Sequence, residues 1–224
     1  MSSVEFAEAQ RVATNPLVTI ERRFLIWMAG RLPGWVGSDG LTALALAAMA
    51  LVGLCFAIAK DHPGALLVAI AGLAINWFGD SLDGTLARVR RQQRPRYGFY
   101  VDHIVDCFGV LFVMAGLGWS GYMTPAVAMA FLIAYFILSI EIYLATYCLA
   151  EFRLSFWGVG PTELRLLLAA GSLALLYDPR VQILGERYRL FDVGGVVGTI
   201  GIFVTLLVSV RRNIRLLYLA EPLQ

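Results

Sequence analysis

The sequence predicts an all-α integral membrane protein with six transmembrane helices and an N-terminal amphipathic helix at the membrane interface. Composition is the first reason, because 59% of the 224 residues are hydrophobic, 15% are charged and the mean hydropathy is +0.72. A water-soluble domain of this length would carry about 25% charged residues. The second reason is that the apolar residues form six long stretches, which lack the alternation typical of a transmembrane strand.

Residues 1–40 come before the first of these stretches and are expected to lie in the cytoplasm. Between residues 22 and 32, arginines are interspersed with aromatic and aliphatic side chains. This mixture predicts an amphipathic helix in the interface of the membrane. A disordered tail with one apolar patch is the alternative interpretation.

The six apolar stretches come next, and most are close to the ~20 residues that cross a ~30 Å hydrocarbon core. They cover residues 41–59, 64–82, 98–118, 124–149, 162–177 and 193–210. The fifth is short, so it could be tilted or could re-enter the membrane. We expect residues 41–215 to form one six-helix domain and residues 216–224 to form a C-terminal tail.

Arginine and lysine residues determine the predicted orientation. If both termini lie in the cytoplasm, that side carries most of the positive charge, including the arginine-rich turn between the second and third stretches. The opposite side keeps Lys60, Arg180, Arg187 and Arg189. Because cytoplasmic loops are enriched in Arg and Lys, we expect a multi-pass protein with its termini and this turn in the cytoplasm.

Four aspartates stand near that turn, at the ends of the second and third stretches. Asp80 and Asp83 are three residues apart and Asp102 and Asp106 are four apart, so each pair shares one face of its helix. A short turn joins the two helices, so we expect antiparallel neighbours whose carboxylates converge. At ~4 Å and an effective dielectric near 20, two carboxylates repel by about 4 kcal/mol. Four such groups therefore require cations or protonation, and an intramembrane cluster of this kind indicates a functional site.

The predicted ligand set contains only carboxylate oxygens. Such a set favours Mg²⁺, Mn²⁺ or Ca²⁺ over Zn²⁺. Two ions shared by four aspartates would suit a two-metal site for phosphoryl transfer. Small residues, Gly84, Ala87 and Gly98, leave the helix surface beside the acids nearly bare, although helix packing is an alternative reason for them. Arg88 could bind a ligand or could simply extend to the membrane surface.

These residues occur together at fixed offsets. In order, they are Asp80-x2-Asp83-Gly84-x2-Ala87-Arg88, nine residues, then Gly98-x3-Asp102-x3-Asp106. This pattern resembles the signature of the CDP-alcohol phosphotransferase family, also called CDP-alcohol phosphatidyltransferases, which are membrane enzymes of phospholipid synthesis. All the signature residues are present, and the gap is one residue longer than is usual in the family. The resemblance covers roughly residues 15–215.

The resemblance implies a transferase with six membrane helices, usually a homodimer, whose active site faces the cytoplasm. The four aspartates would bind two divalent cations, Mg²⁺ or Mn²⁺, against the pyrophosphate of a CDP-linked donor. Gly84, Ala87, Arg88 and Gly98 would frame the cytidine nucleotide. The hydroxyl of an acceptor alcohol would attack the phosphorus distal to cytidine, and CMP would leave. Besides these substrates we expect membrane lipids and a second copy of the chain as partners, and no nucleic acid.

Two residues are candidates for the catalytic base. Asp106 is the base that the family resemblance implies. His103 makes the string Asp-His-x2-Asp, which resembles the choline and ethanolamine phosphotransferase branch. A histidine at the start of a helix is otherwise a hydrogen-bonded structural residue, so the choice of base stays open.

Arg153 and Arg165 are the candidate residues for the acceptor side. The segments around them loosely resemble the amino-alcohol branch, and Glu163 with Arg165 equally resembles the branch that uses inositol phosphate. The short chain favours CDP-diacylglycerol as donor, with transfer of CDP-choline or CDP-ethanolamine groups to diacylglycerol as the alternative. A cation or proton transporter would also place acids in the membrane, including Glu141. A transporter predicts broken helices or repeated halves, which the sequence lacks.

Overall fold

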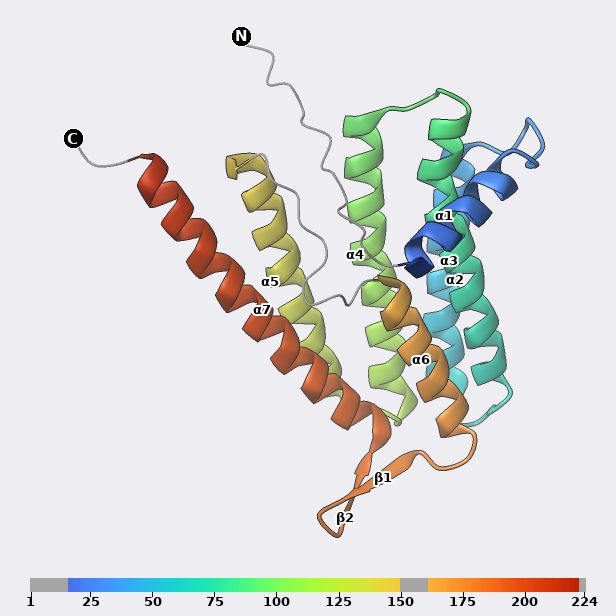
Figure 1. The fold of residues 1–224 in the computed structure, drawn as a ribbon. Coiled ribbons are helices and arrows are strands. Elements are labelled where there is room, and N and C mark those ends of the chain that lie inside the picture. The colour runs from blue at the N-terminus through green and yellow to red at the C-terminus, as the bar shows by residue number, and fades with distance from the viewer. Residues whose placement is uncertain (1–15, 150–160, 222–224) are drawn as a thin grey trace.

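The computed structural model describes residues 16–149 and 161–221, and these residues form seven helices and one hairpin (Figure 1). In chain order the elements are α1 (Pro16–Ala29), α2 (Ser38–Ile58), α3 (Ala65–Val89), α4 (Pro95–Ser120), α5 (Pro125–Leu149), α6 (Pro161–Leu175), β1 (Arg180–Ile183), β2 (Glu186–Arg189) and α7 (Leu190–Ala220). Every predicted stretch coincides with a helix. The two short strands between α6 and α7 were not predicted, so the all-α prediction is wrong for that segment.

Five helices of the described chain, α2, α3, α4, α5 and α7, are long and apolar enough to cross a membrane. The fifth predicted stretch, residues 162–177, corresponds to α6, which has 15 residues. At 1.5 Å per residue such a helix is about 22 Å long, shorter than the ~30 Å core. The multi-pass character of the chain is therefore supported by five helices, and the crossing by α6 stays a prediction.

Helix α2 is the centre of the bundle, because it packs against both α3 and α4. Small residues allow this close packing. A Cβ added to Gly116 of α4 would lie 2.0 Å from the carbonyl oxygen of Gly53 in α2. One added to Gly79 of α3 would lie 2.6 Å from the carbonyl oxygen of Leu41. These glycines therefore let the helix backbones touch.

The expected direct packing of α3 on α4 is wrong. The two helices run antiparallel and are joined by the arginine-rich turn, but each has α2 as its principal neighbour. The physical reason is that the glycine and alanine surfaces on α3 and α4 both complement α2. Helix α6 packs on α3, and α5 packs on α4 and α7.

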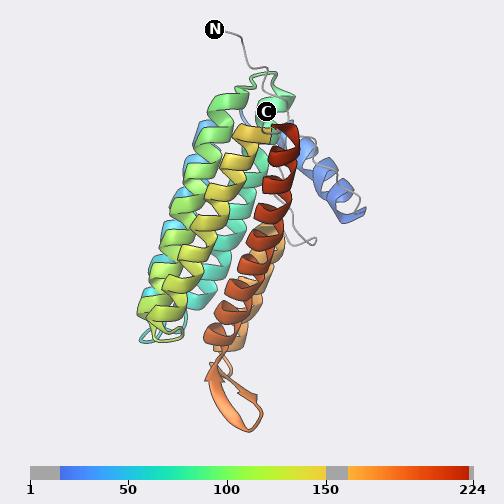
Figure 2. The same cartoon turned by 90° about the vertical axis from the view of Figure 1, so that its left-hand side faces the viewer.

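Helix α1 runs obliquely to the long helices, at the same end as the arginine-rich turn (Figure 2). Leu25 and Ala29 are buried against Leu82 and Leu86 of α3. Trp27 is among several exposed apolar side chains on its other face. The helix begins earlier and ends earlier than residues 22–32, and its place in the membrane interface stays a prediction.

Candidate active site

Asp83 is fixed by the first turn of α2. The hydroxyl of Thr42 donates to Oδ2 of Asp83 at 2.6 Å, and the backbone N–H of Gly84 donates to Oδ1 at 2.5 Å. The hydroxyl of Ser38 also donates to the backbone carbonyl of Asp83 at 2.6 Å. Two helices therefore determine the orientation of this carboxylate.

Asp80 is paired with an arginine from α6. Nη2 of Arg165 donates to Oδ2 of Asp80 at 2.5 Å, and Nε of Arg165 donates to Oδ1 of Asn76 at 2.7 Å. The Asn76 amide in turn donates to the carbonyl oxygen of Ala45 in α2 at 3.0 Å. The side chains of Arg165 and Asp80 are 13% and 23% exposed. This chain of bonds therefore links α2, α3 and α6 beside a predicted metal ligand.

On α4, Asp102 lies at the surface and His103 is buried behind it. Nδ1 of His103 lies 2.6 Å from the carbonyl oxygen of Phe99 and 4.0 Å from Oδ2 of Asp102. The imidazole ring also stands 4.1 Å from the Phe99 ring and 5.3 Å from the Tyr143 ring, measured between centroids. Because a carbonyl can only accept, Nδ1 is the nitrogen that donates. The contacts fit the structural interpretation of His103, and its catalytic role stays a prediction.

Asp106 lies within the electrostatic reach of the other three aspartates. Asp80, Asp83 and Asp102 repel its ionised carboxylate, and Arg165 attracts it. Among residues 16–149 and 161–221, no group donates a hydrogen bond to Asp106. The four carboxylates from α3 and α4 thus share one region of the bundle, where Arg165 of α6 supplies a counter-charge.

The donor chemistry of this region fits a hard divalent cation, because it offers mainly carboxylate oxygens. The neighbouring Cys107 is a thiol that lies 3.8 Å from the hydroxyl of Tyr143. Within the described chain, however, no three acidic, histidine or cysteine side chains come close enough together to enclose one ion. The role of the four aspartates as cation ligands therefore stays a prediction.

The small signature residues do not serve helix packing in the described chain. A Cβ on Gly98 would have no atom within 4 Å, and one on Gly84 would meet only the guanidinium of Arg88, at 3.5 Å. Arg88 lies along α3, where its Nη2 donates to the hydroxyl of Thr85 at 3.1 Å. Ala87 is half-buried. The bare surface beside the acids is therefore open to a ligand.

The turn between α3 and α4 is held by two arginines. Arg90 donates to the carbonyl oxygens of Val36, Leu32 and Pro33, at 2.5, 3.1 and 2.9 Å. Arg94 donates through Nη2 to both carboxylate oxygens of Asp39, at 2.6 and 2.8 Å. This hydrogen bond raises the pKa of the Arg94 guanidinium above its ordinary value. These contacts attach the turn to the segment that leads into α2.

Sequence reasoning missed three polar residues around the acids. Asn76 and Thr42 contact the site directly, and Tyr143 on α5 has its hydroxyl 3.8 Å from Sγ of Cys107. A signal existed, because each is a polar residue within an apolar stretch. Their partners lie far away in sequence and could not be identified from it. Arg153 lies outside the described residues.

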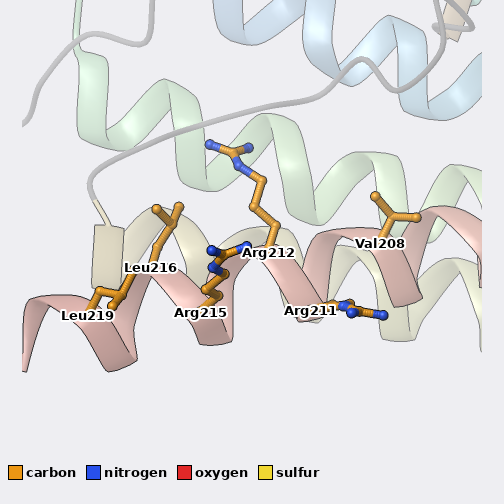
Figure 3. Close-up of a pocket in the computed structure, with 6 residues that line it drawn as sticks. All are labelled: Val208, Arg211, Arg212, Arg215, Leu216 and Leu219. Carbon is orange, nitrogen blue, oxygen red and sulfur yellow. The ribbon is translucent and has the colours of Figure 1, made fainter. Parts of the chain in front are cut away.

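A separate hollow lies on α7, where its C-terminal part carries three arginines (Figure 3). Its volume is about 520 Å³, and its lining consists of Val208, Arg211, Arg212, Arg215, Leu216 and Leu219. None of the candidate site residues lines it. The arginines belong to the basic end of the molecule that also contains the α3–α4 turn.

Comparison with known proteins identifies the family. The family model described as CDP-alcohol phosphatidyltransferase matches residues 35–209, which include every signature aspartate. The chain therefore belongs to the CDP-alcohol phosphatidyltransferase family, whose members are membrane transferases of phospholipid synthesis that act on CDP-alcohols. The comparison with curated proteins gives no match.

Proposed function

We propose that this protein transfers a phosphatidyl group from CDP-diacylglycerol to an acceptor alcohol, releases CMP and uses two divalent cations. The observation that carries the proposal is that four carboxylates from α3 and α4 lie within electrostatic range of one another in an apolar bundle. Placing an ionised carboxylate inside a membrane raises the free energy of the protein unless the charge is paired. A reaction that needs cations beside a pyrophosphate explains why four carboxylates lie there, because they would bind these cations.

Asp80, Asp83, Asp102 and Asp106 would hold the cations. When bound, Mg²⁺ or Mn²⁺ neutralises charge that develops on the transferring phosphate and on CMP. Asp83 is oriented for this task by Thr42 and Gly84. Asp80 would exchange its bond to Arg165 for a cation, which makes Arg165 available to the acceptor side.

The surface around Gly84 and Gly98 supports binding of the nucleotide. Neither glycine is covered by another helix in the described part of the chain, so the cytidine ring or its phosphates can approach the backbone. Arg88 extends along the same face of α3 and would contact the donor's phosphates. The short side chain of Ala87 leaves room for the donor on that face of α3.

The transfer step needs a group that removes the acceptor proton. A bond forms between the acceptor oxygen and the phosphorus distal to cytidine, and the bond from that phosphorus to the bridging oxygen breaks. CMP leaves with the electron pair, and the hydroxyl proton passes to a base. We assign this role to Asp106, because described residues donate no hydrogen bond that would lower its basicity.

His103 is the alternative base. Its Nδ1 faces the carbonyl of Phe99 and its ring is enclosed by Phe99 and Tyr143, which supports a role in holding α4 beside α5. Near-normal turnover of His103→Ala would leave Asp106 as the base. A large loss of kcat with unchanged thermal stability would instead assign the proton transfer to His103.

The experiment uses purified full-length protein in lipid nanodiscs with Mg²⁺. CDP-diacylglycerol, CDP-choline and CDP-ethanolamine are each offered with a panel of acceptors, and both CMP and the mass of the lipid product are measured. We expect CMP only with CDP-diacylglycerol, and Asp83→Asn should abolish it. Asp61→Asn, an exposed acid at the opposite end of the bundle, is the matched control.

The outcomes separate the alternatives. A product from CDP-choline or CDP-ethanolamine and diacylglycerol would replace the proposed donor by the amino-alcohol class. Full activity of Asp83→Asn would remove the cation assignment. The same preparations, analysed by cross-linking in the membrane, should also show the homodimer that we expect.

A further inference from the structure

The hairpin β1–β2 lies at the end of the bundle opposite to the carboxylates and projects beyond the helices (Figure 1). Leu184 and Gly185 form its two-residue turn, with φ of 52° and 91°, as a type I′ hairpin requires. At its base the N–H of Leu190 donates to the carbonyl of Pro179 at 3.0 Å. The ribbon is thus closed at the residue where α7 begins.

The register gives the ribbon two different faces. Arg180 pairs with Arg189, Val181 with Tyr188, Gln182 with Arg187 and Ile183 with Glu186. Directly opposed residues share a face, and neighbours along a strand alternate between faces. The basic face consists of Arg180, Gln182, Arg187 and Arg189. The apolar face consists of Val181, Ile183, Tyr188 and one acid, Glu186.

The basic face carries an unfavourable pair. Arg180 stands directly opposite Arg189, and like charges in this position destabilise a hairpin. Among the residues that the structure describes, neither guanidinium has a carboxylate partner. An anion between the two would turn the repulsion into attraction.

The nearby acids are already engaged. Asp178 accepts from Nη2 of Arg187 at 3.2 Å. Asp192 accepts from both the N–H and the hydroxyl of Thr124, at 2.5 and 2.6 Å. Glu186 is on the other face of the ribbon. Asp61, an exposed acid in the turn between α2 and α3, lies at this end as well, and within the described chain no ion pair joins it to Arg180 or Arg189. An anion from outside the chain therefore fits these two arginines.

The hairpin is attached to a membrane span. Helix α7 can cross the membrane and starts immediately after Arg189. A four-residue strand extends about 13 Å, and the polar layer on each side of a bilayer is about 5–8 Å thick. Trp119 and Tyr177 at the same end are 85% and 92% exposed, as is typical of aromatic residues at the interface. The hairpin is therefore long enough to reach through the headgroup layer.

We propose that the basic face of the hairpin binds the phosphates of anionic phospholipids, with Arg180 and Arg189 sharing one phosphate. Guanidinium groups suit this ligand because they offer planar pairs of donors. Val181, Ile183 and Tyr188 on the other face then lie toward the acyl chains. This lipid site is separate from the carboxylate region and does not depend on the transfer reaction.

The test measures hydrogen exchange of residues 178–190 in full-length protein. Nanodiscs of phosphatidylcholine alone are compared with nanodiscs that also contain phosphatidylglycerol. We expect phosphatidylglycerol to slow exchange of the hairpin, by about fivefold for each arginine that reaches the anionic surface. The double variant Arg180→Gln/Arg189→Gln should lose this response. In phosphatidylcholine alone it should exchange more slowly than the wild type, because the repulsion is gone.

Two controls make the result specific. Lys60→Gln removes one exposed charge from the same end of the bundle and should keep the response to phosphatidylglycerol, unlike Arg189→Gln, which removes the same charge from the hairpin. Inorganic phosphate added to phosphatidylcholine nanodiscs should not protect the hairpin. The proposal is overturned if phosphatidylglycerol leaves the wild-type hairpin unchanged, if the double variant responds fully, or if free phosphate gives the same protection.

Discussion

Several polar side chains inside the bundle are held by a defined partner. In the described part of the chain, no fully buried side-chain nitrogen or oxygen is left without a hydrogen bond. Thr42 orients Asp83, and Asn76 orients Arg165, which in turn holds Asp80. Removing one partner of such a bond leaves the other unsatisfied, which costs about 1–3 kcal/mol.

The bond between Thr42 and Asp83 leads to the first prediction. Thr42→Val keeps the shape of the side chain but removes the hydroxyl, so Asp83 should lose its orientation and kcat should fall about tenfold, which equals about 1.4 kcal/mol. The measurement is CMP release at several Mg²⁺ concentrations. Thr42→Ser retains a hydroxyl and should keep most of the activity. Equal rates for the two variants would contradict the role of this bond.

The pair of Arg165 and Asp80 leads to the second prediction. Arg165→Gln removes the cation beside Asp80 and should lower the free energy of unfolding by about 2 kcal/mol, as expected for a lost hydrogen bond to a charged group. Because Asp80 then lacks a counter-charge, Mg²⁺ should raise the Tm of the variant more than that of the wild type. Thermal unfolding with Mg²⁺ and with EDTA measures both effects. An identical Mg²⁺ response in the two proteins would argue against a cation at Asp80.

At the scale of helices, the contact of α2 with α4 depends on glycine. The third prediction is that Gly116→Ala destabilises the protein by more than about 3 kcal/mol, because the new methyl group would meet the Gly53 backbone rather than a movable side chain. Gly201 of α7 has no atom within 4 Å of the corresponding position. Gly201→Ala should therefore be neutral or stabilising. Thermal unfolding of both variants checks the comparison, and similar Tm values would refute it.

The sequence predicted the five long helices well, because each of their apolar runs has the length of a membrane crossing and lies between polar turns. The structure begins α3 at Ala65 and ends it at Val89, so the helix does carry the acids through to the arginine-rich turn. Which helices touch could not be predicted. Packing of α2 between α3 and α4 depends on complementary small surfaces, and the spacing of apolar residues does not reveal these.

Only the part of the candidate site that depends on local spacing could be predicted from the sequence. The four aspartates and the small residues beside them lie within one short segment, so their helical spacing already places them on shared faces. The bond from Arg165 to Asp80 joins residues 85 positions apart, and local spacing carries no information about it. The hairpin was missed because its strands have four residues each and are rich in charge.

At the scale of the whole molecule, α5 and α7 form a pair that is joined by side-chain hydrogen bonds near both ends. At one end Asp192 accepts two hydrogen bonds from Thr124. Toward the other end Glu141 accepts from the Ser209 hydroxyl at 2.9 and 3.0 Å and from the Asn213 amide at 2.7 Å. The pair meets the rest of the bundle mainly through α4.

The fourth prediction concerns the hydrogen bonds of Glu141 to α7. Glu141→Leu leaves Ser209 and Asn213 without their acceptor and should lower the free energy of unfolding by about 1–3 kcal/mol. Glu141→Gln keeps a carbonyl oxygen and should be milder. Below the Tm of both variants, CMP release should stay near the wild-type rate, since Glu141 is not among the site acids. A specific loss of turnover at unchanged stability would instead give Glu141 a part in the reaction.

We expect the touching glycines of α2 and α4 to act as a pivot for α4. Asp106 lies ten residues from Gly116, or about 15 Å along the helix. A swing of about 10° around that point would carry Asp106 about 2.5 Å sideways at the same helical rise, while the pivot itself barely moves. Such a tilt of α4 would change the separation between its aspartates and those of α3, and an arriving cation would then draw the two sets of oxygens together without unfolding either helix.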